Sequence, residues 1–215
     1  YRDDITGQIL RDDLVQAARA LGLQYFNKKG VWTKRPKQLA RQRTGKGPIS
    51  VRWVDVNKGD DLNPKYRSRL VARQLKAHDR SGASFFAPTP PLEALRTVIS
   101  LAATTVGDHR PNWDPTSPTR TQLSFIDVSR AYFNADEDPE HPTFVQLPGE
   151  DVDCGTLVAR LLKCMYGTRA AADGWQTEYS TMLVQELGFN EYTAHHGDTF
   201  NMVLFTLSLM IGTAG

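Results

Sequence analysis

Cysteine is scarce in this 215-residue sequence, and so are signals for export. The two cysteines, Cys154 and Cys164, show neither a CxxC nor a Cys/His spacing. This pattern argues against a structural zinc site and against a disulfide scaffold. The first residues are polar and charged, unlike a signal peptide, and the chain starts at Tyr, which predicts a fragment or a processed product. We expect a reducing compartment and an intracellular location, either cytoplasmic or nuclear.

Long apolar runs are also missing, and no clear membrane span is predicted. The most apolar stretch, 201–211, is shorter than the roughly 20 residues that cross a bilayer. We interpret it as a buried strand or a truncated element. An alternative is burial of this tail against a partner or at a membrane, because an exposed apolar tail favours aggregation.

Acidic residues are absent between Asp13 and Asp55, and this gap dominates the charge pattern. Residues 1–80 hold 19 Lys/Arg and 8 Asp/Glu, a net charge of +11, although the whole chain carries only +2. Aromatic residues lie among the cations, and such surfaces bind phosphates and stack on bases. We therefore predict RNA or DNA as a partner; the alternative is a solvated basic arm with no partner. The predicted nucleic-acid-binding residues are Lys28, Lys29, Lys34, Arg35, Lys37, Arg41, Arg43 and Lys46.

Hydrophobic periodicity predicts a mixture of helices and strands. Helices are expected at 12–27, 92–106 and 170–189, and a basic loop or flexible arm at 28–50. A hairpin is expected at 51–75, where the turn-forming residues 57–64 separate two strand patterns. Further strands are expected within 122–133, 140–148 and 156–166.

The order of several segments is more informative than any one of them. YRSRLVAR is followed by FIDVSRAYF, FVQLP, LLKCMYGTRAAADGW and a helix pattern that ends in LGF. This order resembles the reverse transcriptase domain of copia-type LTR retrotransposons over roughly residues 50–190. The resemblance implies an RNA-directed DNA polymerase that transfers nucleotides from dNTPs to a primer on a template, and it implies an origin in a polyprotein.

The resemblance also explains the carboxylate in FIDVSRAYF. Asp127 matches the first metal-binding catalytic aspartate of the family, and the Val128 carbonyl is the neighbouring ligand that the resemblance implies. Mg²⁺ is the expected cofactor, because it prefers carboxylate oxygens together with phosphates and waters. Tyr132 matches the aromatic residue that lies under the sugar and excludes a 2′-hydroxyl.

Two further motifs carry implied roles in substrate binding. YRSRLVAR matches the strand whose cations meet the triphosphate, and strand alternation places Arg67 and Arg69 on one face, with Arg73 also on it. The alternative is an exposed charged strand. In MYGTRAA, which matches the segment near the templating base, Gly167 would allow close approach to the base pair, with Tyr166 as a further contact.

The family's second carboxylate motif is not found in its usual form. The resemblance implies an aspartate pair in a hairpin after the LGF helix, but here HHGDTF follows within a few residues. One interpretation is a displaced remnant, with Asp198 as the first aspartate and Thr199 in the second place. The other is that this hairpin is deleted, frame-shifted or outside the fragment. Since a lone aspartate holds two metal ions poorly, we expect the chain to be inactive or nearly so.

The expected fold is therefore α+β: a partial right-hand polymerase with fingers and palm, whose antiparallel sheet is backed by helices. The alternative function is a non-catalytic nucleic-acid-binding or structural subunit of a larger assembly that uses a decayed polymerase scaffold. The predicted regions are an N-terminal helix and basic arm at 1–50, fingers at 51–106, a palm strand with the metal-binding aspartate at 107–136, a return to the fingers at 137–165, a palm helix with a degenerate end at 166–200, and an apolar tail at 201–215.

Overall fold

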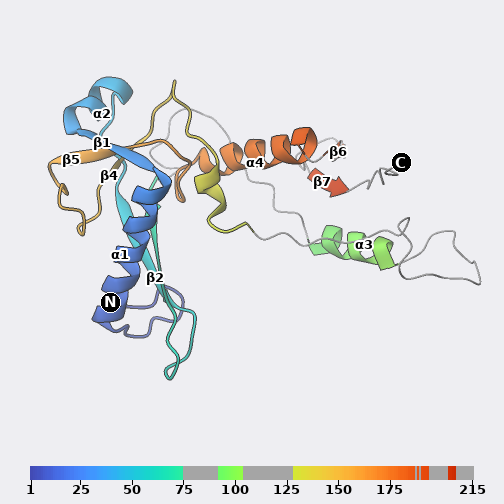
Figure 1. Ribbon diagram of the computed structural model, residues 1–215, viewed down its shortest axis with the longest axis horizontal. Coiled ribbons are helices and arrows are strands. Elements are labelled where there is room, and N and C mark those ends of the chain that lie inside the picture. The colour runs from blue at the N-terminus through green and yellow to red at the C-terminus, as the bar shows by residue number, and fades with distance from the viewer. Residues whose placement is uncertain (75–91, 104–127, 187, 189, 194–202, 207–215) are drawn as a thin grey trace, which may run out of the picture. The chain divides into compact units, whose positions relative to one another are not determined.

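The computed structural model describes residues 1–74, 92–103, 128–186, 188, 190–193 and 203–206. It combines helices with antiparallel sheets, which is compatible with the expected α+β class (Figure 1). The chain divides into two compact units, Tyr1–Phe86 with Arg130–Glu178 and Ala87–Ser129 with Tyr179–Gly215. Among the described residues, no helix has the length and apolar character needed to cross a membrane.

The first helix, α1 (Asp12–Lys29), confirms the helix predicted at 12–27 and extends it by two residues. Aspartates occupy its first turn and lysines its last turn, where each charge complements the helix dipole. The helix ends at Gly30, which takes the left-handed conformation (φ 65°) that glycine adopts without steric cost. The interior side of α1 buries Val15 and Phe26.

The hairpin predicted at 51–75 is confirmed as the strands β2 (Val51–Asn57) and β3 (Tyr66–Ala72). They pair in antiparallel register, with Val54 opposite Arg69 and Val56 opposite Arg67. The helix α1 packs on this hairpin (Figure 1). Gly22 permits the close packing, because a Cβ at this position would lie 3.2 Å from the Trp53 ring.

The prediction of a loop or flexible arm at 28–50 is wrong. This segment forms β1 (Trp32–Pro36) and the helix α2 (Lys37–Thr44), which Gly45 ends in a left-handed conformation. Among its many cations the segment has a few apolar residues, of which Trp32 and Ala40 are buried. The charged side chains lie at the surface, so their number does not prevent the backbone from forming regular structure.

The second sheet has three antiparallel strands in the order β1-β5-β4, with β4 at Phe144–Gln146 and β5 at Leu157–Leu161. Both strands lie within segments predicted as strands. A common core joins this sheet to α1 and β3. Its buried members are Phe26, Val31, Trp32, Leu70, Ala72, Phe133, Val145, Leu147, Ala159, Leu161 and Met165. A smaller cluster of Ala40, Phe144 and Val158 attaches α2.

The predicted turn or helix at the end of FIDVSRAYF is a short 3-10 helix, η2 (Ala131–Asn134). The helix predicted at 170–189 begins as α4 (Ala171–Thr181) and continues as a π-helical turn, Met182–Glu186. The helix predicted at 92–106 is confirmed over α3 (Leu92–Ala103). Residues 122–127, which include most of the strand predicted before η2, lie outside the described residues.

Two short strands, β6 (Asn190–Thr193) and β7 (Val203–Thr206), pair with each other in antiparallel fashion. The strand β7 falls inside the apolar stretch for which a strand was predicted. The residues that join β6 to β7 in the sequence include HHGDTF. A strand pair therefore follows the LGF segment in this chain.

The N-terminal segment covers the open edge of β2. Asp3 accepts hydrogen bonds from the backbone N–H groups of Ile5 and Thr6 at 2.8 and 2.9 Å, and from that of Asn57 at 2.8 Å. Asp4 accepts one from the N–H of Asp55 at 2.8 Å. Two carboxylates thus satisfy donors that an edge strand otherwise leaves open to pairing with other chains.

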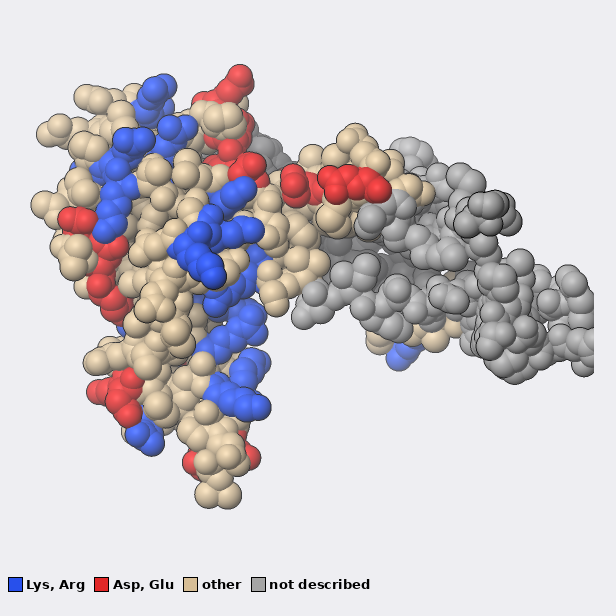
Figure 2. Space-filling model, viewed as in Figure 1, with Lys and Arg blue, Asp and Glu red and all other residues tan. Residues whose placement is uncertain are grey.

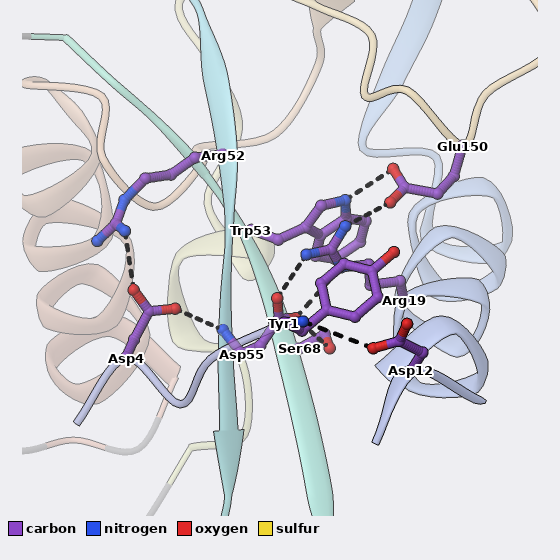
Figure 3. Close-up of polar contacts among 9 residues, drawn as sticks. All are labelled: Tyr1, Asp4, Asp12, Arg19, Arg52, Trp53, Asp55, Ser68 and Glu150. Carbon is purple, nitrogen blue, oxygen red and sulfur yellow. Dashed lines mark hydrogen bonds and ion pairs between the residues drawn. The ribbon is translucent and has the colours of Figure 1, made fainter. Parts of the chain in front are cut away.

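Arg19 connects α1 to the hairpin through an ion pair with Asp55 (2.5 Å) and to Glu150 through another (2.7 Å) (Figure 3). The Arg19 and Asp55 side chains are only 14% and 6% exposed. The Ser68 hydroxyl also donates to Asp55, and Trp53 Nε1 donates to Glu150. Burial opposes the charged form of Glu150, but the hydrogen bonds from Arg19 and Trp53 outweigh it and lower the pKa of this carboxyl.

We predict that Asp55→Ala lowers the free energy of unfolding by about 3 kcal/mol, because it removes the more buried of the two carboxylates that pair with Arg19 and leaves the Ser68 hydroxyl without its acceptor. Asp13→Ala is the control: it breaks an ion pair with Arg11 whose side chains are 62% and 67% exposed. The control should cost much less, because an ion pair this exposed is screened by water and contributes little to stability. Urea unfolding followed by tryptophan fluorescence measures both values, and equal losses would contradict the assignment.

We also predict that Asp3 makes the stability depend on pH. Hydrogen bonds from the backbone N–H groups of Thr6 and Asn57 lower the pKa of Asp3 from 3.8 to about 2. The stabilising contribution is therefore complete above pH 3.8 and is lost as the pH falls through about 2. The difference in melting temperature between wild type and Asp3→Asn should shrink over this range. A difference that stayed constant between pH 4 and pH 2 would show that Asp3 is not the responsible group.

Candidate functional site

The strand β3 holds two arginines on one side and packs the core with the other. Arg67 and Arg69 are exposed, whereas Leu70 is buried and Ser68 bonds to Asp55 beneath the strand. The predicted placement of Arg67 and Arg69 on one face is confirmed, because they lie opposite Val56 and Val54 in the β2–β3 register. The hairpin therefore presents a pair of fork-shaped cations.

Aromatic rings lie directly beside these arginines. Tyr132 of η2 packs against Tyr166 with 4.6 Å between the ring centroids, and Phe133 meets Tyr166 edge-on at 5.5 Å. The guanidinium of Arg69 lies 5.9 Å from the centre of the Tyr166 ring. Three residues that the sequence analysis selected separately, Arg69, Tyr132 and Tyr166, are therefore neighbours in the structure.

The ionisation of Tyr166 reflects the same surroundings. Burial raises the pKa of the Tyr166 phenol. The positive charges of Arg69 and Arg67 oppose this rise, whereas Tyr132 and Tyr25 add to it. The phenol is thus kept neutral and can act as a hydrogen-bond donor.

A small pocket of about 50 Å³ lies among these groups. It combines cations with aromatic and apolar walls and opens beside the β2–β3 hairpin. Its lining residues are Gly22, Phe26, Trp53, Arg67, Ser68, Arg69, Leu70, Arg130, Phe133 and Tyr166. We name it the arginine pocket.

Gly167 joins the arginine pocket to the end of β3 through the backbone. Its φ is +84°, and a Cβ on it would lie 2.0 Å from the Ala72 carbonyl oxygen. Around it, the N–H of Ala72 donates to the Tyr166 carbonyl at 2.8 Å, and the N–H of Gln74 donates to the Gly167 carbonyl at 3.3 Å. The need for glycine is thus explained by contact with β3, and approach to a base pair stays a prediction.

Arg73 does not share the arginine pocket. The strand β3 ends at Ala72, and the exposed Arg73 lines a different pocket of about 510 Å³. The N–H of Arg73 donates to the Ser50 carbonyl at 2.8 Å. That larger pocket is lined by Thr44, Lys46, Gly47, Pro48, Ile49, Ser50, Arg73, Gln74, Pro142, Thr143 and Phe144. Alternation placed Arg73 on the face of Arg67 and Arg69, but the end of the strand interrupts the alternation.

The predicted metal ligands are only partly visible. Asp127 and Asp198 lie outside the described residues, and Val128 is described and partly exposed. In the described ranges, no three His, Cys, Asp or Glu side chains lie close enough together to hold a metal ion. The described residues therefore neither build a metal site nor test the predicted one.

The basic residues of segment 28–46 divide into two groups. The first group makes polar contacts within the protein. Lys34 pairs with Asp151 and Asp153 at 2.6 and 2.7 Å, and Lys29 donates a hydrogen bond to Asn134 at 2.9 Å. Lys and Arg side chains gather over α2, near the end of α1 and along the hairpin (Figure 2). The predicted residues that are exposed and make no ion pair within the described part of the chain are Lys28, Arg35, Lys37, Arg41, Arg43 and Lys46.

The sequence analysis missed Arg130, which lines the arginine pocket, and Tyr25, whose ring holds the Arg130 side chain. Arg130 lines the pocket, and its guanidinium lies 3.7 Å from the centre of the Tyr25 ring. Tyr25 belongs to α1, so no local motif connects the two positions. The only available signal was the group of aromatic residues among the cations of the first 53 residues, which was interpreted as a nucleic-acid surface.

Residues 36–203 match a family model described as reverse transcriptase (RNA-dependent DNA polymerase). The matched segment covers most of the chain and includes β2, β3, η2 and α4, whereas α1 precedes it. No curated protein and no solved structure matches the chain.

We predict that Gly167→Ala strongly destabilises the protein, because the new Cβ collides with backbone atoms of Ala72. Gly155→Ala is the matched control: its φ is +86°, but nothing lies within 4 Å of the added carbon. Strain of the left-handed backbone alone should cost about 1 kcal/mol in the control. Gly167→Ala should cost at least about 3 kcal/mol in the free energy of unfolding. Equal costs in urea titrations would show that the close approach to Ala72 is absent in solution.

Proposed function

The chain belongs to the reverse transcriptase (RNA-dependent DNA polymerase) family, and from this premise we propose that it is the fingers-and-palm part of a copia-type enzyme. Its substrates are a primer–template and deoxynucleoside triphosphates. The observation that carries the proposal is the arginine pocket, where Arg67, Arg69 and Tyr166 meet beside Tyr132. Cations next to a partly buried aromatic pair suit a ligand with a polyphosphate and a flat or sugar-like part.

The proposed roles follow from the chemistry of the side chains. Arg67 and Arg69 donate from their guanidinium edges to phosphate oxygens, and charge-assisted bonds of this kind are about twice as strong as neutral ones. Tyr132 closes the space under the sugar, because its ring is held against Tyr166 and cannot easily move away. A deoxyribose fits such a site better than a ribose. Tyr166 and Gly167 then connect this pocket to the segment near the template.

The family also implies divalent metal ions, and we propose Mg²⁺. Asp127 and the Val128 carbonyl would hold it, with Asp198 as a second carboxylate. When bound, it would neutralise the triphosphate and lower the pKa of the primer 3′-hydroxyl. The contribution of the arginine pocket and of Tyr132 is different: their side chains bind and orient the phosphates and the sugar.

We propose that catalysis by this chain is weak. The pairing of β6 with β7 places a strand pair after the LGF segment, and the residues that join the strands include Asp198. This arrangement favours the interpretation of HHGDTF as a remnant of the second carboxylate motif over its complete loss. Thr199 would then stand in place of a second aspartate, and the carboxylates would be too few to hold two cations well.

An alternative function is supported by the exposed cations of α2. Lys37 and Arg41 lie four residues apart on one helix face, and Arg43 and Lys46 follow without ion pairs within the described residues. A surface of this kind binds nucleic acid without catalysis, as a module or subunit of a larger intracellular assembly on a polymerase scaffold. The division into fingers and palm regions, at the boundaries given in the sequence analysis, belongs to the first proposal, that of a reverse transcriptase.

Binding of dTTP in the presence of Mg²⁺ tests the first function. Arg67→Gln and Arg69→Gln should each weaken dTTP binding about tenfold, because each removes a charged donor to phosphate. Lys65→Gln is the control. It removes an exposed cation that directly precedes β3 but does not line the pocket. Isothermal titration gives the affinities, and primer extension on an RNA template should give no steady product.

The same preparation decides between the functions. If dTTP binding is unaffected by either arginine variant, while Lys37→Gln and Arg41→Gln weaken RNA binding and reduce its salt dependence, the binding-module alternative is correct. Each lost phosphate contact should lower the slope of log affinity against log salt by about 0.7 to 0.9. Steady primer extension that Asp127→Ala abolishes would instead refute the proposed weak catalysis.

A further inference from the structure

Arg130 has an unusual backbone conformation. Its φ and ψ are 53° and 45°, and among the described residues it is the one non-glycine residue with positive φ. The left-handed region is sterically unfavourable for a side chain of this size, so such a conformation persists only when its surroundings impose it. Here the carbonyl of Arg130 accepts a hydrogen bond from the N–H of Phe133 at 3.0 Å, which closes the η2 turn.

The side chain of Arg130 is held in place by α1. Its guanidinium lies 3.7 Å from the centre of the Tyr25 ring, a distance typical of face-to-face stacking, and Tyr25 in turn packs on Phe133 at 5.9 Å. Stacking occupies the flat face of the guanidinium and leaves its N–H edges available to bind another group. Arg130 is half-buried and lines the arginine pocket together with Arg67 and Arg69.

Three arginines therefore line one small pocket, and none of them has a carboxylate partner among the residues that the structure describes. Within the described part of the chain, neither Arg67, Arg69 nor Arg130 forms an ion pair, whereas Arg19 and Arg52 pair with aspartates. Like charges gathered in this way repel one another unless an anion lies among them. The volume of about 50 Å³ is far below the roughly 300 Å³ at which small-molecule pockets begin, so it suits a single phosphoryl group.

We propose that Arg130 is a third phosphate-binding residue of the arginine pocket, and that Tyr25 positions it. The ligand class is a polyphosphate, one phosphoryl group of which enters the pocket. The N-terminal helix α1, which precedes the family-matched residues, is thereby part of the substrate site. This inference rests on the proposed function and names one more residue of its phosphate contacts.

Inorganic tripolyphosphate is the probe, titrated calorimetrically into the full chain without divalent metal. Arg130→Gly should weaken binding at least about tenfold, because it removes a charge-assisted donor. It should leave the melting temperature unchanged or higher, because glycine adopts the left-handed conformation freely. Tyr25→Leu should weaken binding less, by about threefold, since it keeps the apolar packing but frees the guanidinium. Lys65→Gln should bind as the wild type does.

The outcomes separate this inference from the proposed function. If Arg67→Gln weakens tripolyphosphate binding and Arg130→Gly does not, the role of Arg130 is overturned. The proposed phosphate site at Arg67 and Arg69 is then kept. Failure of the wild type to bind tripolyphosphate would overturn both. Should Arg130→Gly fail to fold, Arg130→Asn serves instead, because asparagine also tolerates this conformation.

A second arm distinguishes the source of the phosphate. A single-stranded oligo(dT) without terminal phosphates offers only backbone phosphates, whereas dTTP offers the same triphosphate chemistry as the probe. Loss of dTTP and tripolyphosphate binding in Arg130→Gly, with oligo(dT) binding kept, supports the inference. Loss of oligo(dT) binding alone would overturn it and assign Arg130 to the nucleic-acid strand.

Discussion

The backbone contact between Gly167 and the end of β3 is the constraint on which the candidate site depends. Ala72 and Gln74 bind the carbonyls of Tyr166 and Gly167, although these residues are more than 90 positions apart in the sequence. Because backbone groups meet directly, the Tyr166 ring is set beside Arg69 with little freedom. Tyr132 then has a fixed surface to pack against. The arginine pocket is therefore a consequence of one close approach that only glycine permits.

The N-terminal residues and α1 stabilise the β2–β3 hairpin through separate contacts with β2. Asp3 covers backbone donors at the edge of β2, and Arg19 joins α1 to Asp55 within the sheet. Further along α1, Tyr25 holds Arg130. A helix that stabilises β2 and β3 thus also positions a cation near them. If Arg130 binds phosphate as proposed, stability and ligand binding are coupled, because loosening α1 would both weaken the hairpin and release the Arg130 side chain.

The sequence predicted what local patterns determine and missed what distant packing determines. The β2–β3 hairpin was predictable, since alternating apolar residues flank a turn, and so was the shared face of Arg67 and Arg69. The strand β1 and the helix α2 were not, because few apolar residues in that segment are buried and Lys34 finds its aspartates more than 100 residues later. Arg130 could not be selected at all: a left-handed arginine that stacks on a distant tyrosine leaves no periodicity or spacing to detect.

The cations of this chain differ in their partners more than in their number. Arg19 and Lys34 each bind two carboxylates, so their charges are neutralised by ion pairs within the fold. Arg67, Arg69 and Arg130 have no such partners among the described residues, yet the fold holds them around one pocket. Keeping like charges together costs free energy, and a protein that needed only stability would replace one of them with a neutral residue. The arrangement is reasonable if an anion enters the pocket during function. Since β3 ends at Ala72, Arg73 is directed to another pocket, and the bound anion would meet three arginines rather than four.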